Sequence, residues 1–440
     1  MIEDIIRERE KKRSELKKLG KDPYPATITR THSIGEVLDS FADLSKSKKK
    51  VAIAGRVMGW RVQGGVAFAD LRDENGKIQT VIKKDNLADF ELLKNNLDIG
   101  DFLAVEGPVF KTQRGEKSVE AKKVTVAVKA LRPLPSVWHG LKEVEERFRK
   151  RYLDTLLNAD VKEKLAKRSE VVGHLRSALA KEGFLEVETP ILQPIPGGAT
   201  ARPFKTHHNA LDVDFYLRVA PELYLKRLLV GGFEKVFEIG RNFRNEGIDR
   251  DHNPEFTMLE LYWAYQDCKG LMKFVEKLLK PFIKGKFKTV AFSDLIKNWE
   301  SVKPEQLDEI FKKEARPKIK EPTFVTDYPE VIMPLAKLRE KNPKLTESFQ
   351  LIVNGSEIVK GFSELNDPVV QRAQMERQEK EHRSGNEEVS RLDEDFLEAL
   401  EYGMPPAAGL GLGIDRLVTL VTGAHSVKEI IAFPTLRPKE

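Results

Sequence analysis

The chain has 440 residues, of which 33% are charged and 8% aromatic, and its net charge is +6. That length suffices for two or three domains with complete cores, and the composition is ordinary for a soluble enzyme. The single cysteine, Cys268, excludes an internal disulfide and a zinc site built from cysteines, and it fits a reducing, cytoplasmic location. No apolar stretch approaches the roughly 20 residues of a membrane span, so no membrane partner is expected.

The positive charge is concentrated in the N-terminal third of the chain. The first 135 residues carry 27 Lys and Arg against 20 Asp and Glu, whereas the remainder carries 48 against 49. This asymmetry predicts a polyanionic partner for the N-terminal part and a small-molecule site elsewhere. A solvated basic face gives the same pattern, so the charge alone is weak evidence.

A basic amphipathic helix is predicted over residues 2–19, and a Pro- and Thr-rich connector completes the segment 1–33. We expect this helix to pack on the next domain with partial contact to RNA. Residues 34–133 then show three strands, a helix and two strands, which is typical of an oligonucleotide-binding (OB) barrel; a small barrel without a ligand also fits. The strands are predicted over 51–60, 66–72, 78–83, 102–111 and 119–128, and the helix over 87–95.

Residues 134–150 are predicted to link the barrel to a second domain over 151–440. That domain begins with a helix over 161–182 and continues with antiparallel-looking strands alternating with helices. It has neither a GxGxxG motif after a first strand nor a GK[ST] phosphate loop, so the two common nucleotide-binding folds are not supported. Residues 280–288 and 303–320 have few apolar residues and are predicted to be connectors.

The most informative segment is FRNEGIDRDHNPEF, residues 243–256, which lies between strands predicted over 235–242 and 256–264. Arg244 offers a rigid fork of donors for carboxylate or phosphate oxygens, and Glu246 can accept from an amine. Cationic side chains at the loop tip can reach the far phosphates of a nucleotide. The loop could therefore hold an acid and a triphosphate together, although a merely solvated hairpin has the same composition.

Two further motifs accompany this hairpin, GFLEVETPIL at residues 183–192 and GLGLGIDRL at residues 409–417. Each has an ordinary alternative, a helix-to-strand transition for the first and close packing of a Gly-rich strand for the second. In this order and spacing, the three segments resemble the three motifs of class II aminoacyl-tRNA synthetases, and most closely those of bacterial lysyl-tRNA synthetases.

The resemblance implies an α+β fold, in which an antiparallel-sheet catalytic domain follows an all-β OB barrel that binds the anticodon, and it implies a homodimer. The expected reaction joins L-lysine and Mg-ATP into lysyl-adenylate with release of pyrophosphate, and then transfers lysine to the 3′ end of lysine tRNA. One anion attacks another in the first step, so positioning and charge neutralisation are the main requirements.

For ATP, the resemblance implies that Arg244 bridges the substrate carboxylate and the α-phosphate, while Glu246 accepts from the adenine amine. His252 would approach the far phosphates, Phe256 would stack on adenine, and Glu357 would bind Mg²⁺. No zinc is expected. The implied ATP-binding set is Arg244, Glu246, His252, Asn253, Phe256, Glu357 and Arg416, with Arg244 and Arg416 as the catalytic pair.

For lysine, the resemblance implies that Glu222, Glu364 and Tyr262 hold the ε-ammonium group. A compact ammonium has three donors, which two carboxylates and a hydroxyl recognise well. Substrates without the charge would leave two acids unpaired, which disfavours them by roughly 10⁴. The implied lysine-binding set is Gly198, Glu222, Arg244, Glu260, Tyr262, Lys360, Phe362 and Glu364, with Glu260 and the Gly198 backbone at the α-amino group and Phe362 over the methylenes.

Two positions depart from the family pattern near the metal site. Gln350 stands where the family has a second acid, and Lys360 stands where it has Asn. The number of Mg²⁺ ions is therefore open, and Lys360 could meet the substrate carboxylate as a point charge or turn away. Strict alternation would put Glu357 and Glu364 on opposite faces of one strand, so a bulge or strong twist is required, and Gly361 is the candidate for it.

In the barrel, the resemblance implies that Arg56, Phe68 and Gln79 contact the anticodon. A base stacked on Phe contributes roughly 1–3 kcal/mol, and Gln reads a uridine edge well, although Phe68 could instead belong to the barrel core. The pair His207–His208 with Asp214 is interpreted as structural, because adjacent strand residues point apart and one ion is unsuited to both.

Three rivals to a lysyl-tRNA synthetase remain. A paralogue that lysylates a protein such as elongation factor P would lack the barrel. A catalytically silent RNA-binding protein is disfavoured by the intact Arg244, Glu246, Glu357 and Arg416, although Gln350 keeps it open. Activation of aspartate or asparagine is disfavoured because acidic pocket residues would repel an acidic substrate.

Overall fold

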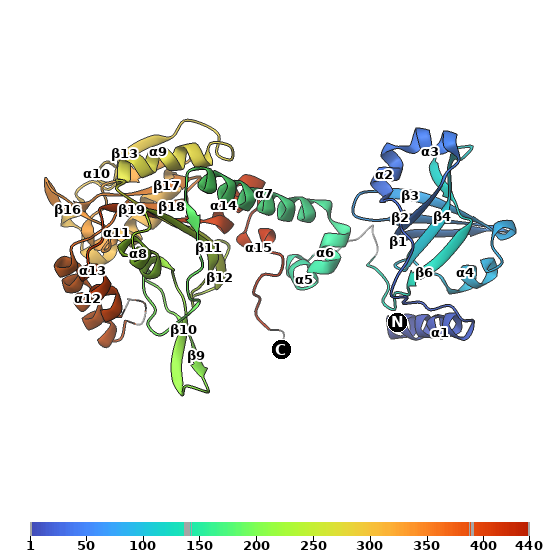
Figure 1. Ribbon diagram of the computed structural model, residues 1–440, viewed down its shortest axis with the longest axis horizontal. Helices are drawn as coiled ribbons and strands as arrows, with labels where there is room; N and C mark the ends of the chain where they lie inside the picture. Colours follow the sequence, from blue (N-terminus) through green and yellow to red (C-terminus); the bar gives the residue numbers. More distant parts are fainter. Residues whose placement is uncertain (1, 136–140, 142, 387, 389–390, 439–440) are drawn as a thin grey trace. The chain divides into compact units, whose positions relative to one another are not determined.

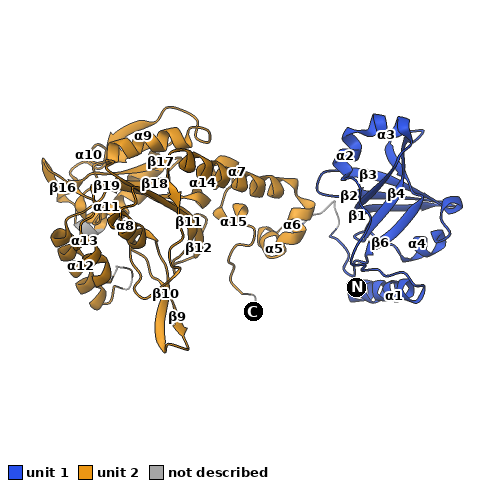
Figure 2. Cartoon of the chain, in the orientation of Figure 1, with its two compact units in different colours: residues 1–142 blue, residues 143–440 orange. Residues whose placement is uncertain are grey.

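The computed structural model describes residues 2–135, 141, 143–386, 388 and 391–438 (Figure 1). The chain forms two compact units, Met1–Lys142 and Glu143–Glu440 (Figure 2). In the described part of the chain, no helix is both long enough and apolar enough to cross a membrane. Of the predicted linker, residues 136–140 and 142 lie outside the described residues, and its last residues form a helix of the second unit, α5 (Val144–Arg149).

The first unit is the predicted closed barrel. Its strands pair in the order β1-β2-β3-β5-β4-β6, and an additional pairing of β1 with β4 closes the sheet. The predicted last strand is divided in two at residues 121–122. The strands are β1 (Lys50–Gln63), β2 (Val66–Arg72), β3 (Lys77–Lys83), β4 (Phe102–Lys111), β5 (Lys117–Glu120) and β6 (Lys123–Val128), with helix α4 (Phe90–Asn96) between β3 and β4.

Alternation along β2 shows which side chains fill this barrel. Ala67, Ala69 and Leu71 are fully buried, whereas Phe68 and Asp70 between them are half-buried on the outer face. Phe68 is therefore a surface residue of the barrel and not part of its core.

Helix α1 (Ile2–Lys18) packs on the barrel against α4 and belongs to the same unit. Leu16 is buried in the barrel core, and the buried Arg9 donates to the carbonyls of Ile99, Ala130 and Arg132. The helix is thus held by both apolar and polar contacts. Two short helices, α2 (Ile34–Asp39) and α3 (Phe41–Ser47), follow it, and Ser33 and Glu36 form a capping box at the start of α2.

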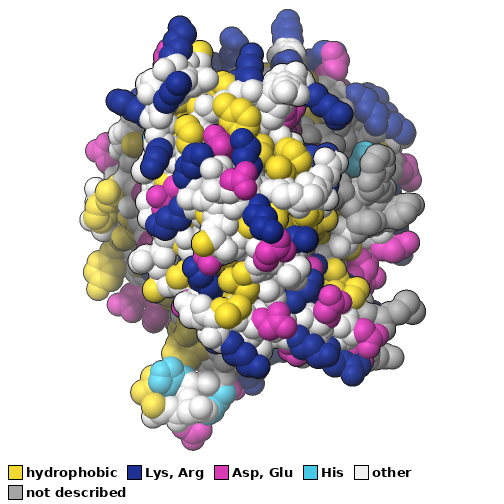
Figure 3. Space-filling model, turned by 90° about the vertical axis from the view of Figure 1, so that its right-hand side faces the viewer, with side chains coloured by type: hydrophobic (Ala, Val, Ile, Leu, Met, Phe, Trp, Pro, Cys, Tyr) yellow, Lys and Arg dark blue, Asp and Glu magenta, His cyan; other side chains and the backbone are white. Residues whose placement is uncertain are grey.

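Basic side chains are spread over this part of the surface. On the face shown in Figure 3, Lys and Arg alternate with acidic and apolar groups over a wide area and do not gather in one patch. On this face the positive charge is therefore diffuse.

The second unit contains an eight-stranded sheet in the order β13-β14-β17-β18-β19-β12-β11-β7. The five pairings in its middle are antiparallel, and the pairings at its two ends are parallel. The predicted antiparallel sheet is thus confirmed. The strands are β7 (Leu185–Glu186), β11 (Lys235–Phe243), β12 (Glu255–Ala264), β13 (Lys288–Ala291), β14 (Thr323–Thr326), β17 (Ser348–Val353), β18 (Ser356–Ser363) and β19 (Ala407–Gly413).

Helices on the two faces of this sheet bury different apolar clusters. Helices α7 (Ala159–Lys181), α9 (Cys268–Leu279) and α14 (Ile414–Thr422) contribute to the largest cluster. Helices α8 (Glu222–Val230) and α13 (Glu394–Glu401) pack together in a second cluster, which includes Tyr262 from the sheet and Met375 from α12 (Pro368–Arg383) (Figure 1). The remaining helices and short strands are α6 (Arg151–Leu157), α10 (Phe292–Leu295), α11 (Pro304–Ile310), α15 (Val427–Ile430), β8 (Leu192–Gln193), β9 (Phe204–His208), β10 (Val213–Leu217), β15 (Leu338–Arg339) and β16 (Asn342–Thr346).

The prediction of a connector over residues 303–320 is wrong. Helix α11, a π-helical turn (Phe311–Ala315) and a short 3₁₀ turn fill this range. Leu307, Phe311 and Ala315 recur every fourth residue and are buried. Charged residues fill most of the positions between these three, and their abundance concealed the helical period.

A β-bulge in β18 brings its acidic residues to one face. Leu351 of β17 pairs with Val359, but the next residue, Ile352, pairs with Glu357, so Ile358 is the extra residue. Ile358 and Val359 are both buried in the main core. The bulge that the sequence required is therefore present, but it lies at Ile358 and not at Gly361.

Gly361 has a different constraint, which is close packing. A Cβ atom there would lie 2.8 Å from the ring of Phe349 and 3.0 Å from the carbonyl oxygen of Gly409. A side chain at this position would push strand β18 away from its neighbours.

Candidate active site

A buried acidic pocket lies where α8 meets strands β12, β18 and β19. Glu222 comes from the first turn of α8, Glu260 and Tyr262 from β12, and Phe362 from β18, with Glu364 directly after that strand. All five are buried, and Glu364 is only 1% exposed. The structure therefore brings together the lysine-binding residues that the sequence predicted.

Glycine in β19 makes this convergence possible. A Cβ atom on Gly409 would collide with a carboxylate oxygen of Glu364 and with the ring of Tyr262. At Gly409, the Gly-rich strand thus admits pocket side chains from its neighbours.

Burial changes the acidity of the pocket. It raises the pKa of Glu260 to about 8, and the nearby Glu222 carboxylate adds to the effect. It also raises the pKa of Glu364, although the ammonium of Lys226 acts in the opposite direction. Oε1 of Glu364 has no hydrogen-bond partner among the described residues, whereas Oε2 lies against that ammonium. A buried acid with a free oxygen is costly unless a further cation or donor binds it.

Lys226 is the pocket residue that sequence reasoning missed. It is fully buried, and its Nζ atom lies 2.5 Å from Oε1 of Glu222 and 2.6 Å from Oε2 of Glu364. The signal was available, since Lys226 follows Glu222 by four residues and so shares its face when the segment is helical, as it is in α8.

Gly198 lies directly against Glu222. Its φ of +88° is a conformation that favours glycine, and a Cβ atom there would lie 2.8 Å from the Cβ of Glu222. The backbone of the loop before α8 therefore reaches the pocket wall, as the prediction for the α-amino group requires.

The arginine of the long hairpin, Arg244, lies beside this pocket. Its Cζ atom is 5.0 Å from the centroid of the Phe256 ring, and its buried Nε has no hydrogen-bond partner among the described residues. Burial lowers the pKa of Arg244, whereas Glu246 and Glu260 act to raise it. The guanidinium thus interacts electrostatically with Glu246 of the hairpin and with Glu260 of the pocket, and its Nε atom is available to donate to a ligand.

The second predicted catalytic arginine, Arg416, lies in the first turn of α14, and its side chain contacts both the hairpin and β18. Its guanidinium lies 3.2 Å from Nε2 of His252 and 3.7 Å from Oε1 of Glu357. Asp249 holds the other ring nitrogen of His252 at 2.9 Å. This chain of polar contacts gathers three of the predicted ATP-binding side chains in one place, and Asp249 is a further supporting residue that sequence reasoning missed.

The other two hairpin candidates differ in their surroundings. Glu246 is exposed and able to accept from a ligand. Asn253 is buried, its Nδ2 donates to the carbonyl of Glu255 at 2.6 Å, and its Oδ1 has no partner among the described residues. Asn253 therefore shapes the hairpin and retains one acceptor.

The two positions that depart from the family pattern face each other. Gln350 and Lys360 are directly paired across β17 and β18. Gln350 is buried and accepts a hydrogen bond from the hydroxyl of Tyr328 at 3.0 Å. Lys360 is half-buried and has no ion-pair partner within the described part of the chain. Its ammonium is therefore available to an anionic ligand.

The donor set fits a Mg²⁺ ion that arrives with ATP. Within the described ranges, no group of three or more Asp, Glu, His or Cys side chains could hold a metal. Glu357 supplies one carboxylate, and Mg²⁺ commonly takes one or two carboxylates together with substrate phosphates and water.

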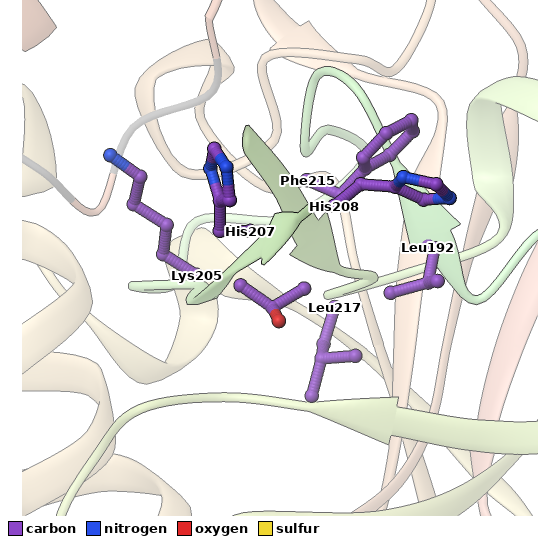
Figure 4. A pocket seen from close by; sticks show the side chains of 7 residues that line it. Leu192, Lys205, His207, His208, Phe215 and Leu217 are labelled. Atoms are coloured by element: carbon purple, nitrogen blue, oxygen red, sulfur yellow. The ribbon is translucent and has the colours of Figure 1, made fainter. Parts of the chain in front are cut away.

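A shallow hollow of about 270 Å³ lies along the β9–β10 hairpin, away from the acidic pocket (Figure 4). His207 pairs with Asp214 at 3.1 Å and with Asp212 at 3.3 Å, whereas His208 points to the other side and lies near Phe215. The two histidines thus point apart, as the sequence predicted.

On the barrel, Phe68 and Gln79 lie on the outer face of neighbouring strands, and Arg56 lies farther along β1, opposite Arg72. The Arg56 guanidinium stacks on Phe102 at 4.2 Å and donates to the carbonyl of Gly100. Arg61 is instead paired with Phe68 across β1 and β2, and its guanidinium lies 6.0 Å from the Phe68 ring. Sequence reasoning missed Arg61, although strand pairing through the short turn at residues 64–65 would have indicated it.

Comparisons with known proteins agree with this arrangement. The family described as tRNA synthetases class II (D, K and N) matches residues 143–437, and the OB-fold nucleic acid binding domain matches residues 51–127. The chain is 44% identical to a lysine--tRNA ligase of Pelotomaculum thermopropionicum, over 100% of this chain and 96% of that protein. It is 44% identical to the lysine--tRNA ligase of Carboxydothermus hydrogenoformans (100% and 99%) and 43% identical to that of Bacillus subtilis (100% and 98%).

Proposed function

The chain belongs to the class II tRNA synthetases, and we propose that it attaches lysine to tRNA by way of lysyl-adenylate. The observation that carries this proposal is the buried pair Glu222 and Glu364, which already contacts one ammonium group, that of Lys226. A pocket with this chemistry suits a substrate with a cationic side chain.

In this proposal the substrate side chain enters between Tyr262 and Phe362 and places its ε-ammonium against Glu222 and Glu364. Glu260 and the Gly198 backbone receive the α-amino group. Arg244 then directs the substrate carboxylate toward ATP. Because Arg244 interacts electrostatically with Glu260, the amino acid and the nucleotide would meet at this arginine.

For ATP, we propose that Glu246, Asn253 and Phe256 hold the adenosine, and that His252 and Arg416 contact the phosphates. When bound, Mg²⁺ supplies charge neutralisation on the phosphates, and Glu357 is the residue that would hold it. Lys360 adds a fixed positive charge beside the reacting carboxylate and α-phosphate. The carboxylate is itself the nucleophile, so no general base is needed.

The second step requires tRNA, and we propose that the barrel reads its anticodon through Arg61, Phe68 and Gln79. The presence of the barrel argues against transfer of lysine to a protein acceptor. We further propose that the enzyme is a cytoplasmic homodimer. Exposed apolar side chains in the first motif, Leu185, Ile191 and Leu192, support such an interface.

Lysine-dependent exchange of pyrophosphate into ATP tests the first step. We expect exchange with lysine and little with norleucine, which has the same four side-chain carbons but lacks the ammonium group. Stronger exchange with aspartate or asparagine would contradict the proposal. Charging of tRNA with the lysine anticodon, compared with the same tRNA carrying an altered anticodon, tests the second step.

A further inference from the structure

The internal ammonium of Lys226 occupies the position expected for the substrate cation. It contacts Glu222 and Glu364, and it lies 5.9 Å from the centroid of the Tyr262 ring and 5.6 Å from that of Phe362. The first three groups are the ones assigned to the ε-ammonium of the substrate, and Phe362 is the one assigned to its methylenes. Either Lys226 leaves when lysine binds, or the two ammonium groups share the carboxylates.

Burial favours sharing. Lys226 has no exposed surface, and it lies on the inner side of α8 with Leu225 and Leu229, which are also buried. Moving its ammonium away from both acids would leave a charge among apolar side chains, which is strongly unfavourable. The two acids also offer four carboxylate oxygens, of which Lys226 contacts one on each.

We propose that Lys226 is a specificity-determining residue of the lysine pocket, which stays in place as a permanent counter-ion while the substrate ammonium binds the remaining oxygens of Glu222 and Glu364. The inference rests on the proposed function. When both carboxylates are ionised, two negative charges and one internal positive charge leave a net charge of −1. The pocket therefore accepts one further cation, and the four charges alternate in sign around a ring.

The same ammonium limits how deep a substrate can reach. A longer side chain would bring its cation against Lys226, whereas a shorter one would fall short of the two acids. The charged and titratable groups around Lys226 come from three elements. They are Glu222 of α8, Glu260 and Tyr262 of β12 and Glu364 after β18, with Arg218 and Arg244 acting on Glu260.

A Lys226→Met variant of the full chain tests the counter-ion directly, because Met has a similar length and no charge. Without the ammonium, the two carboxylates repel and one of them keeps a proton. Lysine binding must then displace that proton, so KM for lysine in the exchange reaction should rise at pH 7 and approach the native value at pH 9. We expect the pH midpoint of this KM change to move up by about one unit relative to the native chain.

Lys129 provides a matched control in the other unit. It is also a buried lysine between two acids, with Nζ 2.8 Å from Asp101 and 2.5 Å from Asp98. Lys129→Met should lower the temperature of unfolding but leave the pH midpoint for lysine unchanged. A folded Lys226→Met variant with a native pH midpoint would overturn the inference.

A second comparison uses a different pair of variants, in which removal of the Lys226 ammonium should strengthen lysine binding instead of weakening it. Glu222→Gln leaves Glu364 and Lys226 with no net charge, so lysine should bind weakly. Adding Lys226→Met to that variant restores a charge of −1 once Glu364 is ionised, so we expect lysine affinity, measured by calorimetry at pH 9, to increase at least about tenfold. Equal or weaker binding by the double variant would show that Lys226 acts only through packing and would overturn the inference.

The native chain separates this inference from the proposed function. Without lysine-dependent exchange by the native enzyme, the proposed function itself is wrong. If native exchange is present while the variants fail to behave as described, only the role of Lys226 is lost.

Discussion

The acidic residues of the pocket bind protons in a range where most carboxylates do not. Because burial raises the pKa of Glu260 to about 8 and also raises that of Glu364, the pocket without substrate holds protons at neutral pH. A bound ammonium favours the charged carboxylate, so lysine binding should release protons at pH 7. Lysine affinity should accordingly increase as pH rises from 6.5 to about 8.5.

Calorimetry in two buffers with different ionisation enthalpies measures this release. The apparent binding enthalpy should differ between the buffers at pH 7 and converge near pH 9, where the acids are already ionised. Identical enthalpies at pH 7 would show that both acids are charged before lysine arrives.

A single methyl group should also disrupt the pocket. In Gly409→Ala the new Cβ meets Glu364 and Tyr262, so we expect KM for lysine to rise by about tenfold or more, which corresponds to roughly 1.4 kcal/mol, while KM for ATP changes less. Gly173→Ala on α7 is the control, because nothing lies within 4 Å of its Cβ position. That change should raise stability by about 0.5–1 kcal/mol and leave both KM values unchanged. Similar kinetics for the two variants would contradict the role given to Gly409.

At the scale of single residues, the sequence predicted the acidic pocket residues Glu222 and Glu364 but not their counter-ion, Lys226. Glu222 and Glu364 are found through local motifs, and each motif carries its own chemistry. The spacing of four residues links Lys226 to Glu222, but its contact with Glu364 forms only when α8 and the end of β18 come together, which is a tertiary contact that no local pattern contains. Arg61 was missed for a related reason, since its position depends on the pairing of β1 with β2.

At the scale of elements, strand geometry decides which side chains share a face. Strict alternation would place Glu357 and Glu364 on opposite faces of the strand, and the bulge at Ile358 places them on the same face. The need for a bulge follows from the sequence. Its place does not, because Ile358 and Val359 read as an ordinary strand and only the packing of both into the core shows the extra residue.

Strand pairing in the barrel gives the prediction that belongs to this scale. Arg61 lies next to Phe68 on the outer face, with an exposed side chain, whereas Arg56 stacks on Phe102. Arg61→Ala should raise KM for tRNA by about tenfold, in keeping with roughly 1–3 kcal/mol for a base-stacking contact, and should leave lysine-dependent exchange unchanged. Arg56→Ala should instead lower the unfolding temperature.

Steady-state charging and thermal unfolding measure both variants. The reverse result, with Arg56 affecting tRNA binding and Arg61 only stability, would restore the assignment made from the sequence.

At the scale of the whole molecule, charge and chemistry are divided between the two units. The positive excess belongs to the barrel and its helix, whereas the nearly neutral second unit contains the buried pocket. This division was predictable from residue counts alone. The packing of α1 on the barrel was also predicted, but the hydrogen bonds from Arg9 that hold it were not, because they join it to carbonyls about ninety or more residues away.

The division predicts that salt affects the two steps differently, with a strong effect on tRNA binding and a weak effect on lysine-dependent exchange. Binding of tRNA releases counter-ions from its phosphates, so log KM for tRNA should rise linearly with log salt concentration, with a slope of roughly 0.7–0.9 for each phosphate contact. Lysine-dependent exchange should change little between about 50 and 200 mM salt, because its charged groups are buried and poorly screened.

Arg61→Ala should reduce the slope for tRNA by about one if Arg61 also contacts a phosphate, and should leave it unchanged if Arg61 only stacks on a base. An equally steep salt dependence of exchange would mean that the acidic pocket is open to solvent ions, contrary to the burial of Glu222 and Glu364.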